Sequence, residues 1–235
     1  MINAAAITNS KVSQYRLRVR YRKDGRLAYL GHLEVINTIN RSVRRSQLPF
    51  AVGNGFARRM RLQFSQALPV GAASMGEYFD LFLTQETDPQ DALGRIAQTT
   101  PTLLAPSAAA YVPYELPALE AWLTRSTWSV GVIDDTDVLA LARGIDSVRA
   151  KGRLTYMRGE MEKHVDLART LVSCETRPSG DGFLLDCRST EEGSLRPAIL
   201  LSAAAREAGL AMPAISVCRL AQWHEAEDGS LVEPM

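Results

Sequence analysis

Four arginines alternate with apolar residues near the start of the chain and are the strongest candidates for chemistry. They are Arg16, Arg18, Arg20 and Arg22. Successive side chains of a strand point to opposite faces, so these guanidinium groups line one face, about 6.6 Å apart. Like charges at this spacing repel one another unless an anion lies across them. The anion is either a carboxylate of this chain, for which Glu77, Asp80 and the acidic second half are candidates, or a phosphate-bearing or acidic partner.

The net charge of +1 conceals an uneven distribution. Residues 15–66 carry 12 basic and 2 acidic side chains, hence +10, whereas the rest of the chain carries 15 basic and 24 acidic ones, hence −9. This polarity predicts an electrostatic partner, or docking of the two parts on each other. The side chains that we expect to extend the basic surface are Arg44, Arg45, Arg58, Arg59 and Arg61. Asn54 begins a turn that either binds an anion through backbone amides or only connects two strands.

Other residues that carry chemistry are few. As a general base, His32 would need an orienting carboxylate, and Glu34 is too close along a helix to face it, so a capping or packing role is favoured. His164 and Asp166 share a strand face, but their spacing matches no specific metal site, and we expect no metal and no cofactor. The three cysteines, Cys174, Cys187 and Cys218, are not clustered as an iron–sulfur centre requires.

These residues must be positioned by two successive sets of strands and helices. In the first set we expect strands over 15–23, 50–53, 60–65 and 77–84 and helices over 32–46 and 88–98, from period-2 and helical spacing of apolar residues. In the second we expect strands over 128–133, 153–158, 165–176, 182–188 and 214–223 and helices over 134–143 and 195–208. The two sets repeat a similar order of elements without repeating the sequence.

The predicted fold class is α+β, with two ferredoxin-like units whose antiparallel sheets carry helices on one face. The expected organisation is a flexible tail over 1–14, a basic unit over 15–100, a linker rich in proline and alanine over 101–126, and a second unit over 127–235. In such a unit the first and third strands are neighbours, so the arginines of 16–22 and 59–61 are expected to share one face.

Several stretches resemble the radical SAM-linked protein family, a domain of unknown function found beside or fused to radical S-adenosylmethionine proteins. They are Tyr21-Arg22-Lys23, Gly25-Arg26-Leu27, Tyr29-Leu30-Gly31-His32-Leu33-Glu34, Arg44-Arg45, Leu48-Pro49, Gly55-Phe56, Ala67-Leu68-Pro69-Val70-Gly71, Glu77-Tyr78 with Asp80, Lys163-His164-Val165-Asp166-Leu167 and Gly193-Ser194-Leu195-Arg196-Pro197. The chain departs from the family pattern at 57–61, where a basic stretch replaces a loop stiffened by prolines. The resemblance implies a radical SAM protein as partner, and that protein would carry the iron–sulfur cluster.

We therefore expect a non-catalytic companion of a radical SAM enzyme that binds substrate, RNA or a ribonucleoprotein, or docks on the enzyme through a basic sheet face. The aromatic residues alternate out of phase with the arginines, which favours contact with the nucleic-acid backbone over base readout. The alternatives are a metal-independent RNA endonuclease with His32 as base, and a plain protein-interaction scaffold. No signal peptide or membrane span is recognisable, so a cytoplasmic location without membrane contact is expected.

Overall fold

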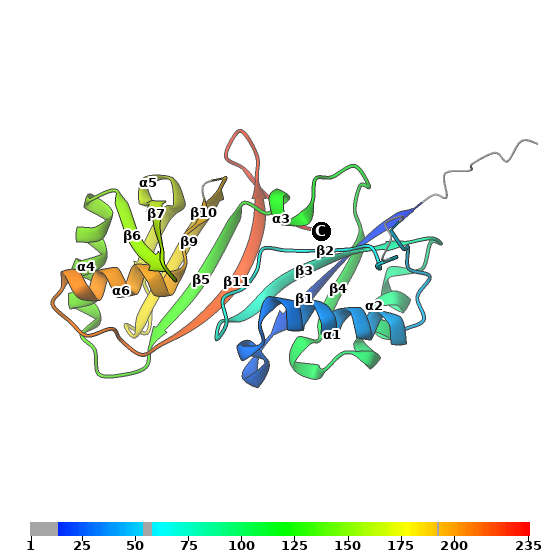
Figure 1. Ribbon diagram of the computed structural model, residues 1–235, viewed down its shortest axis with the longest axis horizontal. Helices are drawn as coiled ribbons and strands as arrows, with labels where there is room; N and C mark the ends of the chain where they lie inside the picture. The colour runs from blue at the N-terminus through cyan, green and yellow to red at the C-terminus, as the bar shows by residue number, and fades with distance from the viewer. Residues whose placement is uncertain (1–13, 54–57, 192) are drawn as a thin grey trace, which may run out of the picture.

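The structure is a computed structural model that describes residues 14–53, 58–191 and 193–235. Among these residues it contains one large mixed sheet of ten strands and six α-helices (Figure 1). The α+β class is therefore confirmed, whereas the division into two ferredoxin-like units is not. The tail predicted over 1–14 lies, except for Gln14, outside the described residues, as does Asn54.

The first half places two helices on one face of four strands. Its elements are β1 (Tyr15–Lys23), η1 (Gly25–Tyr29), α1 (His32–Arg45), β2 (Leu62–Phe64), β3 (Ala73–Leu83), α2 (Pro89–Thr99), η2 (Thr102–Leu104) and β4 (Pro106–Tyr111). The strand order is β4-β1-β3-β2, and all neighbours are antiparallel. Leu17, Val19 and Tyr21 of β1 lie in one buried cluster with Val35 and Ile39 of α1. The alternation read from the sequence thus places the apolar residues of β1 in the core.

The second half repeats this strand order with a hairpin inserted. Its elements are β5 (Arg125–Val132), α4 (Val138–Ala150), β6 (Arg153–Arg158), β7 (Met161–Asp166), α5 (Leu167–Thr170), β8 (Leu171–Thr176), β9 (Gly182–Thr190), β10 (Gly193–Ser194), α6 (Pro197–Glu207), β11 (Ile215–Glu225) and β12 (Leu231–Val232). Its order is β11-β5-β9-β8, while β6 and β7 form a separate two-stranded sheet. The pseudo-repeat of element order is thus present in the pairing.

The segment predicted as a linker, 101–126, contains η2, β4 and the short helix α3 (Leu119–Trp122). Its alanines are typical of a linker, but Ala109 of β4 packs in the same buried cluster as Ala92 and Ile96 of α2. Small side chains allow this close approach of strand and helix. Pro106 is the first residue of β4, a position where a strand tolerates proline.

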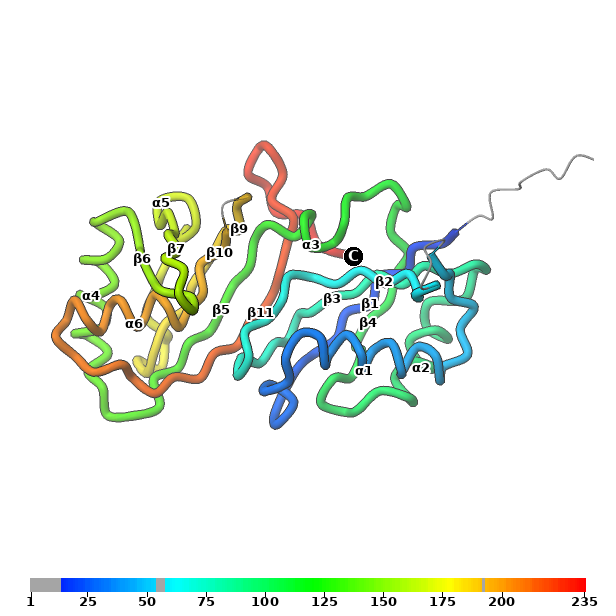
Figure 2. Tube along the Cα trace, viewed as in Figure 1, coloured from blue at the N-terminus to red at the C-terminus, as the bar shows by residue number. Residues whose placement is uncertain are grey.

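β11 joins the two halves into one sheet. It pairs antiparallel with β5 along its length, and in parallel with β3 at Cys218 and Arg219 (Figure 2). The Arg219 guanidinium donates to both carboxylate oxygens of Glu77 on β3, at 2.8 and 2.7 Å, and both side chains are buried. A bidentate pair of this kind fixes the relative placement of the two strands.

Two of the four arginines on the predicted basic face of β1 are buried and paired with a carboxylate. Arg16 and Arg18 are 2% and 0% exposed, and Asp80 lies directly opposite Arg18 in the β1–β3 register. Arg18 donates to both oxygens of Asp80, at 2.7 and 3.0 Å, and Arg16 donates to one of them at 2.7 Å. The sequence left open whether the anion beside these arginines is a carboxylate of this chain or belongs to a partner. For Arg16 and Arg18 it is a carboxylate of this chain.

Backbone carbonyls from two distant segments complete the coordination of Arg16 and Arg18. Arg16 donates to the carbonyl oxygens of Leu116 and Pro117, and Arg18 donates to that of Pro234 at 2.8 Å. The Arg18 guanidinium also lies 4.8 Å from the ring centroid of Trp122 in α3. These contacts bring α3 and the C-terminal segment over the sheet face, beside each other in Figure 1.

Replacing Asp80 with asparagine is expected to destabilise the protein by about 3–5 kcal/mol, because two buried guanidinium groups would lose their counter-charge. Urea unfolding followed by circular dichroism measures this loss. The matched control is Asp91→Asn, which breaks an exposed pair with Arg95 on α2 and should cost less than about 1 kcal/mol. Equal effects of the two substitutions would contradict this role of Asp80.

Helices α4 and α6 touch at a glycine. A Cβ at Gly144 would lie 2.2 Å from the carbonyl oxygen of Ala204, so Gly144→Ala is expected to cost about 1–3 kcal/mol through overpacking. Gly94 in α2 has nothing within 4 Å of the same position, and Gly94→Ala should stabilise by about 0.5–1 kcal/mol. Thermal unfolding of the two variants should therefore shift in opposite directions. A Gly144→Ala protein as stable as the wild type would mean that the helices separate freely.

Candidate functional site

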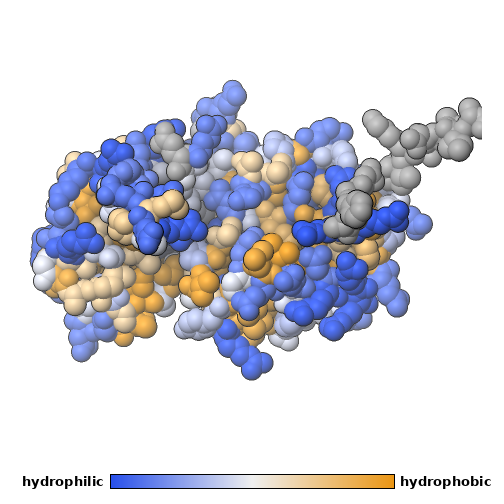
Figure 3. Space-filling view, in the orientation of Figure 1, coloured by the Kyte–Doolittle hydropathy of each residue, from blue (hydrophilic) through white to orange (hydrophobic). Residues whose placement is uncertain are grey.

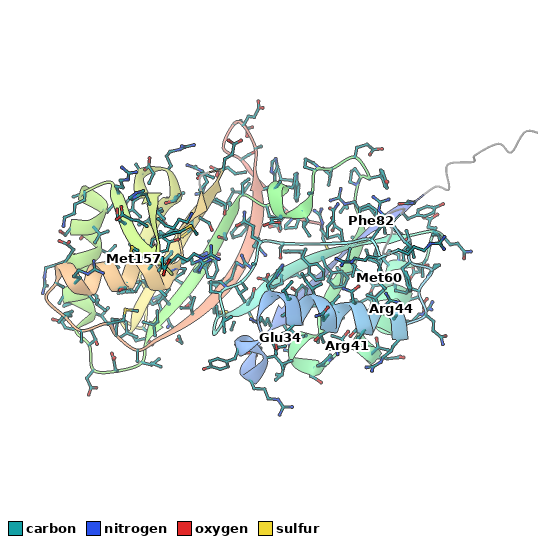
Figure 4. All side chains as sticks on the ribbon, viewed as in Figure 1. Glu34, Arg41, Arg44, Met60, Phe82 and Met157 are labelled. Atoms are coloured by element: carbon teal, nitrogen blue, oxygen red, sulfur yellow. The ribbon has the colours of Figure 1, made fainter. Side chains whose placement is uncertain are left out.

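A groove of about 900 Å³ lies between α1 and the segment 58–64. One wall is the exposed side of α1, and the other is the strand-like segment that leads into β2. Figure 4 shows Glu34, Arg41 and Arg44 along α1 and Met60 on the facing segment. The groove lies on the helix side of the sheet.

The wall formed by α1 follows from helical periodicity. Val35, Ile39 and Val43 are buried against the sheet, so the opposite stripe of the helix is left for polar residues. Asn37, Arg41 and Arg44 are spaced by four and three residues and therefore lie one above another on the side that lines the groove. The helix begins after Gly31, whose backbone N–H donates to the Glu34 carboxylate at 2.7 Å.

The facing wall is held by backbone pairing. The N–H of Gly53 donates to the carbonyl of Arg59 at 2.8 Å, and the N–H of Arg61 donates to the carbonyl of Ala51 at 2.9 Å. Beyond them, β2 pairs with β3. The arginines of this wall are therefore presented from an anchored stretch of backbone.

The groove is strongly basic. Its charged lining residues are Glu34, Arg41, Arg44, Arg58 and Arg59. Within the described part of the chain, none of the four arginines has an ion-pair partner: Arg41 donates to the Thr38 hydroxyl at 3.4 Å, and Arg44 lies 6.0 Å from the Phe50 ring. Four cations that converge without a carboxylate partner are suited to an anion supplied from outside.

Apolar side chains form the rest of the groove. Met60, Leu62 and Phe64 line it from one side and Leu30 and Ile36 from the other. Figure 3 shows hydrophobic residues beside a largely hydrophilic surface on this face of the molecule. Phe64 packs against the core of the first half but is only half-buried, so it offers part of its ring to the groove. Proteins that bind single-stranded nucleic acids combine aromatic rings, on which the bases stack, with cations that pair with the phosphates.

The predicted contact residues are thus only partly brought together. Arg44, Arg58 and Arg59 line the groove, and Arg45 is exposed on α1 without lining it. Arg18 cannot contact a partner in this conformation, because it is fully buried on Asp80. The expectation that 16–22 and 59–61 share one basic face is met only in part. Arg61 does lie on the face of Arg16, since both guanidinium groups lie over the Phe82 ring, whereas Arg59 lines the groove on the other side of the sheet. Carboxylate pairing also removes Arg16 and Arg18 from the surface.

The remaining predicted arginines lie on the sheet face opposite α1. Arg20 donates to the carbonyl of Met75 at 3.2 Å, and Arg22 donates to that of Thr102 at 3.2 Å. The Arg61 guanidinium stacks 4.3 Å from the Phe82 ring and donates to the Tyr114 hydroxyl at 3.1 Å. These three are partly accessible but are already engaged by the protein itself.

His32 is the first residue of α1 and packs edge-on against Phe64, with ring centroids 6.1 Å apart. It lines a cavity of about 10 Å³ with Tyr21, Lys23 and Glu77. The Lys23 ammonium donates to the carbonyls of Ala28 and Leu30, both at 2.8 Å, and burial lowers its pKa. A cavity of this size holds about one water molecule and no substrate, so the packing role predicted for His32 fits its surroundings.

Sequence reasoning missed Arg41 as a groove residue. Its signal was present, because Asn37, Arg41 and Arg44 recur at intervals of four and three residues opposite the apolar stripe. What the sequence did not indicate was the segment that faces this stripe. The distance from α1 to 58–64 is set by the register of β2 on β3, which involves residues far apart in the chain.

The described part of the chain holds neither a metal-binding cluster nor a membrane-spanning helix. Within 14–53, 58–191 and 193–235, no group of three or more histidine, cysteine, aspartate or glutamate side chains is placed to hold a metal ion. Over the same residues, no helix has the length and apolar character needed to cross a membrane.

Comparisons with known proteins identify a family without assigning a function. No curated protein matches the chain. Among solved structures, the chain is similar to an unknown protein from Galdieria sulphuraria at 11% identity, covering 88% of this chain and 99% of that one, and the TM-score of 0.28 is too low to support any argument. The family described as "Uncharacterized protein conserved in bacteria (DUF2344)" matches residues 16–197. This match spans more than half of the chain, which therefore belongs to the DUF2344 family.

Proposed function

We propose that this protein is a non-catalytic binding module that holds single-stranded RNA in the groove between α1 and 58–64. The observation that carries the proposal is the convergence of Arg41, Arg44, Arg58 and Arg59 on one groove, without ion-pair partners among the described residues. Phosphates passing along α1 would be met by cations on both walls. Each neutralised phosphate releases counterions, which makes such binding favourable at low salt.

The apolar lining of the groove favours a single strand over a duplex. The apolar floor with Phe64 would accept unstacked bases, whose π-faces stack on aromatic rings regardless of sequence. A duplex keeps its bases stacked inside and presents only its backbone, so it would leave this floor unused. We therefore infer weak sequence preference and a contact dominated by phosphates.

We further propose that the bound RNA is presented to a radical SAM enzyme, beside which proteins that resemble this one occur. This part of the proposal rests on the resemblance quoted above, and on the need for an electrostatic counterpart to the +10 segment. Its test is co-elution of the protein with the radical SAM protein of the same organism in size-exclusion chromatography, with the iron–sulfur absorbance moving into the complex. Separate elution at micromolar concentrations would remove the companion role and leave RNA binding unaffected.

RNA binding is tested by fluorescence anisotropy with a labelled strand of roughly ten nucleotides, within the range one small domain covers. For four phosphate contacts the slope of log K against log salt should be about −2.8, at roughly 0.7 per contact. In Arg41→Glu/Arg44→Glu the slope should fall to about −1.4. The matched control, Arg143→Glu/Arg206→Glu, makes the same charge change on exposed sites of α4 and α6 and should keep the wild-type slope.

Two outcomes would overturn the proposal. The first is equal weakening by both double variants, which would mean that only overall charge matters. The second is absence of RNA binding by the wild type at about 50 mM salt, which would favour the plain scaffold. Gel analysis of the recovered RNA also tests the endonuclease alternative, since cleavage lost in His32→Ala would make the protein an enzyme.

A further inference from the structure

Two adjoining hollows of about 280 and 250 Å³ lie in the second half, outside the RNA groove. They meet at the connection from β9 through β10 to α6, and the lining residues that they share are Thr190, Gly193, Ser194 and Arg196. Thr190 fixes this connection by donating its hydroxyl to the carbonyl of Gly193 at 3.0 Å. Together the hollows have the volume of a typical small-molecule site.

Two of the stretches quoted for the family resemblance meet at this place. Residues 163–166 line the second hollow from β7, and Gly193, Ser194 and Arg196 line it from β10 and the residue before α6. Figure 1 shows the hairpin β6–β7 close to β10 and α6, although they are distant in sequence. RNA binding in the first-half groove leaves both stretches without a role.

The second hollow is cationic. Arg158, Lys163 and Arg196 line it, and none of these side chains has a hydrogen-bond or ion-pair partner in the part of the chain that the structure describes. The lining carboxylate, Asp166, already accepts the backbone N–H of Arg169 at 3.2 Å. His164 is also engaged, with Thr155 at 2.9 Å and Glu162 at 3.3 Å. Three cations on one hollow with a single occupied carboxylate favour a multiply charged anion.

The first hollow is polar, and its charges are nearly balanced. Arg219 is paired with Glu77, and the remaining charged lining residues are Glu120 and Arg196, the latter shared with the second hollow. Hydroxyl groups supply much of the remaining polar lining. The hydroxyl-bearing residues are Ser126, Ser189, Thr190 and Ser194. Ser126 accepts from the indole N–H of Trp128 at 2.9 Å, and Ser189 donates to Gln66 at 2.9 Å. Such a lining suits a hydroxylated, uncharged body such as a sugar.

We infer that these hollows form a site for a phosphate monoester carried on a hydroxylated body, with the phosphate at Arg158, Lys163 and Arg196 and the body toward Ser126 and Ser189. The site does not depend on the RNA groove. A phosphate monoester can come from a free nucleoside or sugar monophosphate, or from the 5′ end of an RNA strand. Both sources present the same group to the same three cations.

The test is isothermal titration of the full chain with adenosine 5′-monophosphate and with adenosine. The monophosphate should bind and adenosine should bind at least about tenfold more weakly, since charge-assisted hydrogen bonds to the phosphate are lost. The double substitution Lys163→Gln/Arg196→Gln should weaken binding of the monophosphate by a similar factor or more. Arg143→Gln/Arg206→Gln, with the same loss of charge elsewhere, should leave it unchanged, as should Arg41→Glu/Arg44→Glu in the RNA groove.

A second arm separates the two sources. If 5′-phosphorylated RNA binds more tightly than 5′-hydroxyl RNA, and Lys163→Gln/Arg196→Gln removes the difference, the phosphate belongs to an RNA end. If the two RNAs bind alike while the monophosphate binds, the ligand is a free small molecule. Binding of adenosine as tight as the monophosphate, equal losses in the site and control variants, or no monophosphate binding would each overturn the inference. None of these results depends on RNA binding in the first groove.

Discussion

Burial of two carboxylates on β3 is the constraint on which the rest of the structure depends. Glu77 and Asp80 are three residues apart and therefore lie on opposite faces of the strand, and each is almost completely buried. A buried carboxylate is tolerated only when it is paired and fully hydrogen-bonded. Glu77 accordingly recruits Arg219 from β11, and Asp80 recruits Arg16 and Arg18 from β1. One pairing joins the two halves, and the other holds α3 and the C-terminal segment over the sheet.

The same constraint separates the arginines into structural and accessible ones. Arg16, Arg18 and Arg219 are neutralised inside the protein by Asp80 and Glu77, whereas the arginines on α1 and the segment 58–64 form no ion pair with either carboxylate. An arginine-rich sequence therefore does not by itself define a binding face. Here the unpaired arginines face each other across a groove on the helix side of the sheet. The alternation of β1 predicts a basic face on the opposite side.

The sequence predicted most of what depends on neighbours along the chain. The helix expected over 32–46 is α1 at His32–Arg45, and the strand expected over 15–23 coincides with β1, because period-3.6 and period-2 patterns are local. The strand β4 was missed, since alanines and prolines carry little strand propensity and the packing of Ala109 on α2 is a tertiary effect. The pairing of Arg18 with Asp80 needed the β1–β3 register, which the sequence did not give. Of the four arginines that line the groove, the sequence analysis names Arg44, Arg58 and Arg59 but not Arg41.

The junction formed by β11 has a consequence for how the chain is made. Glu77 is synthesised 142 residues before Arg219, and at about 5–20 residues per second the ribosome delivers the arginine roughly 7–28 s later. During that time the start of β3, at Ala73 and Ser74, lacks its β11 partner, and Glu77 lacks its counter-charge. An unpaired strand end can pair with other strands, so the junction between the two halves is completed only after β11 has emerged.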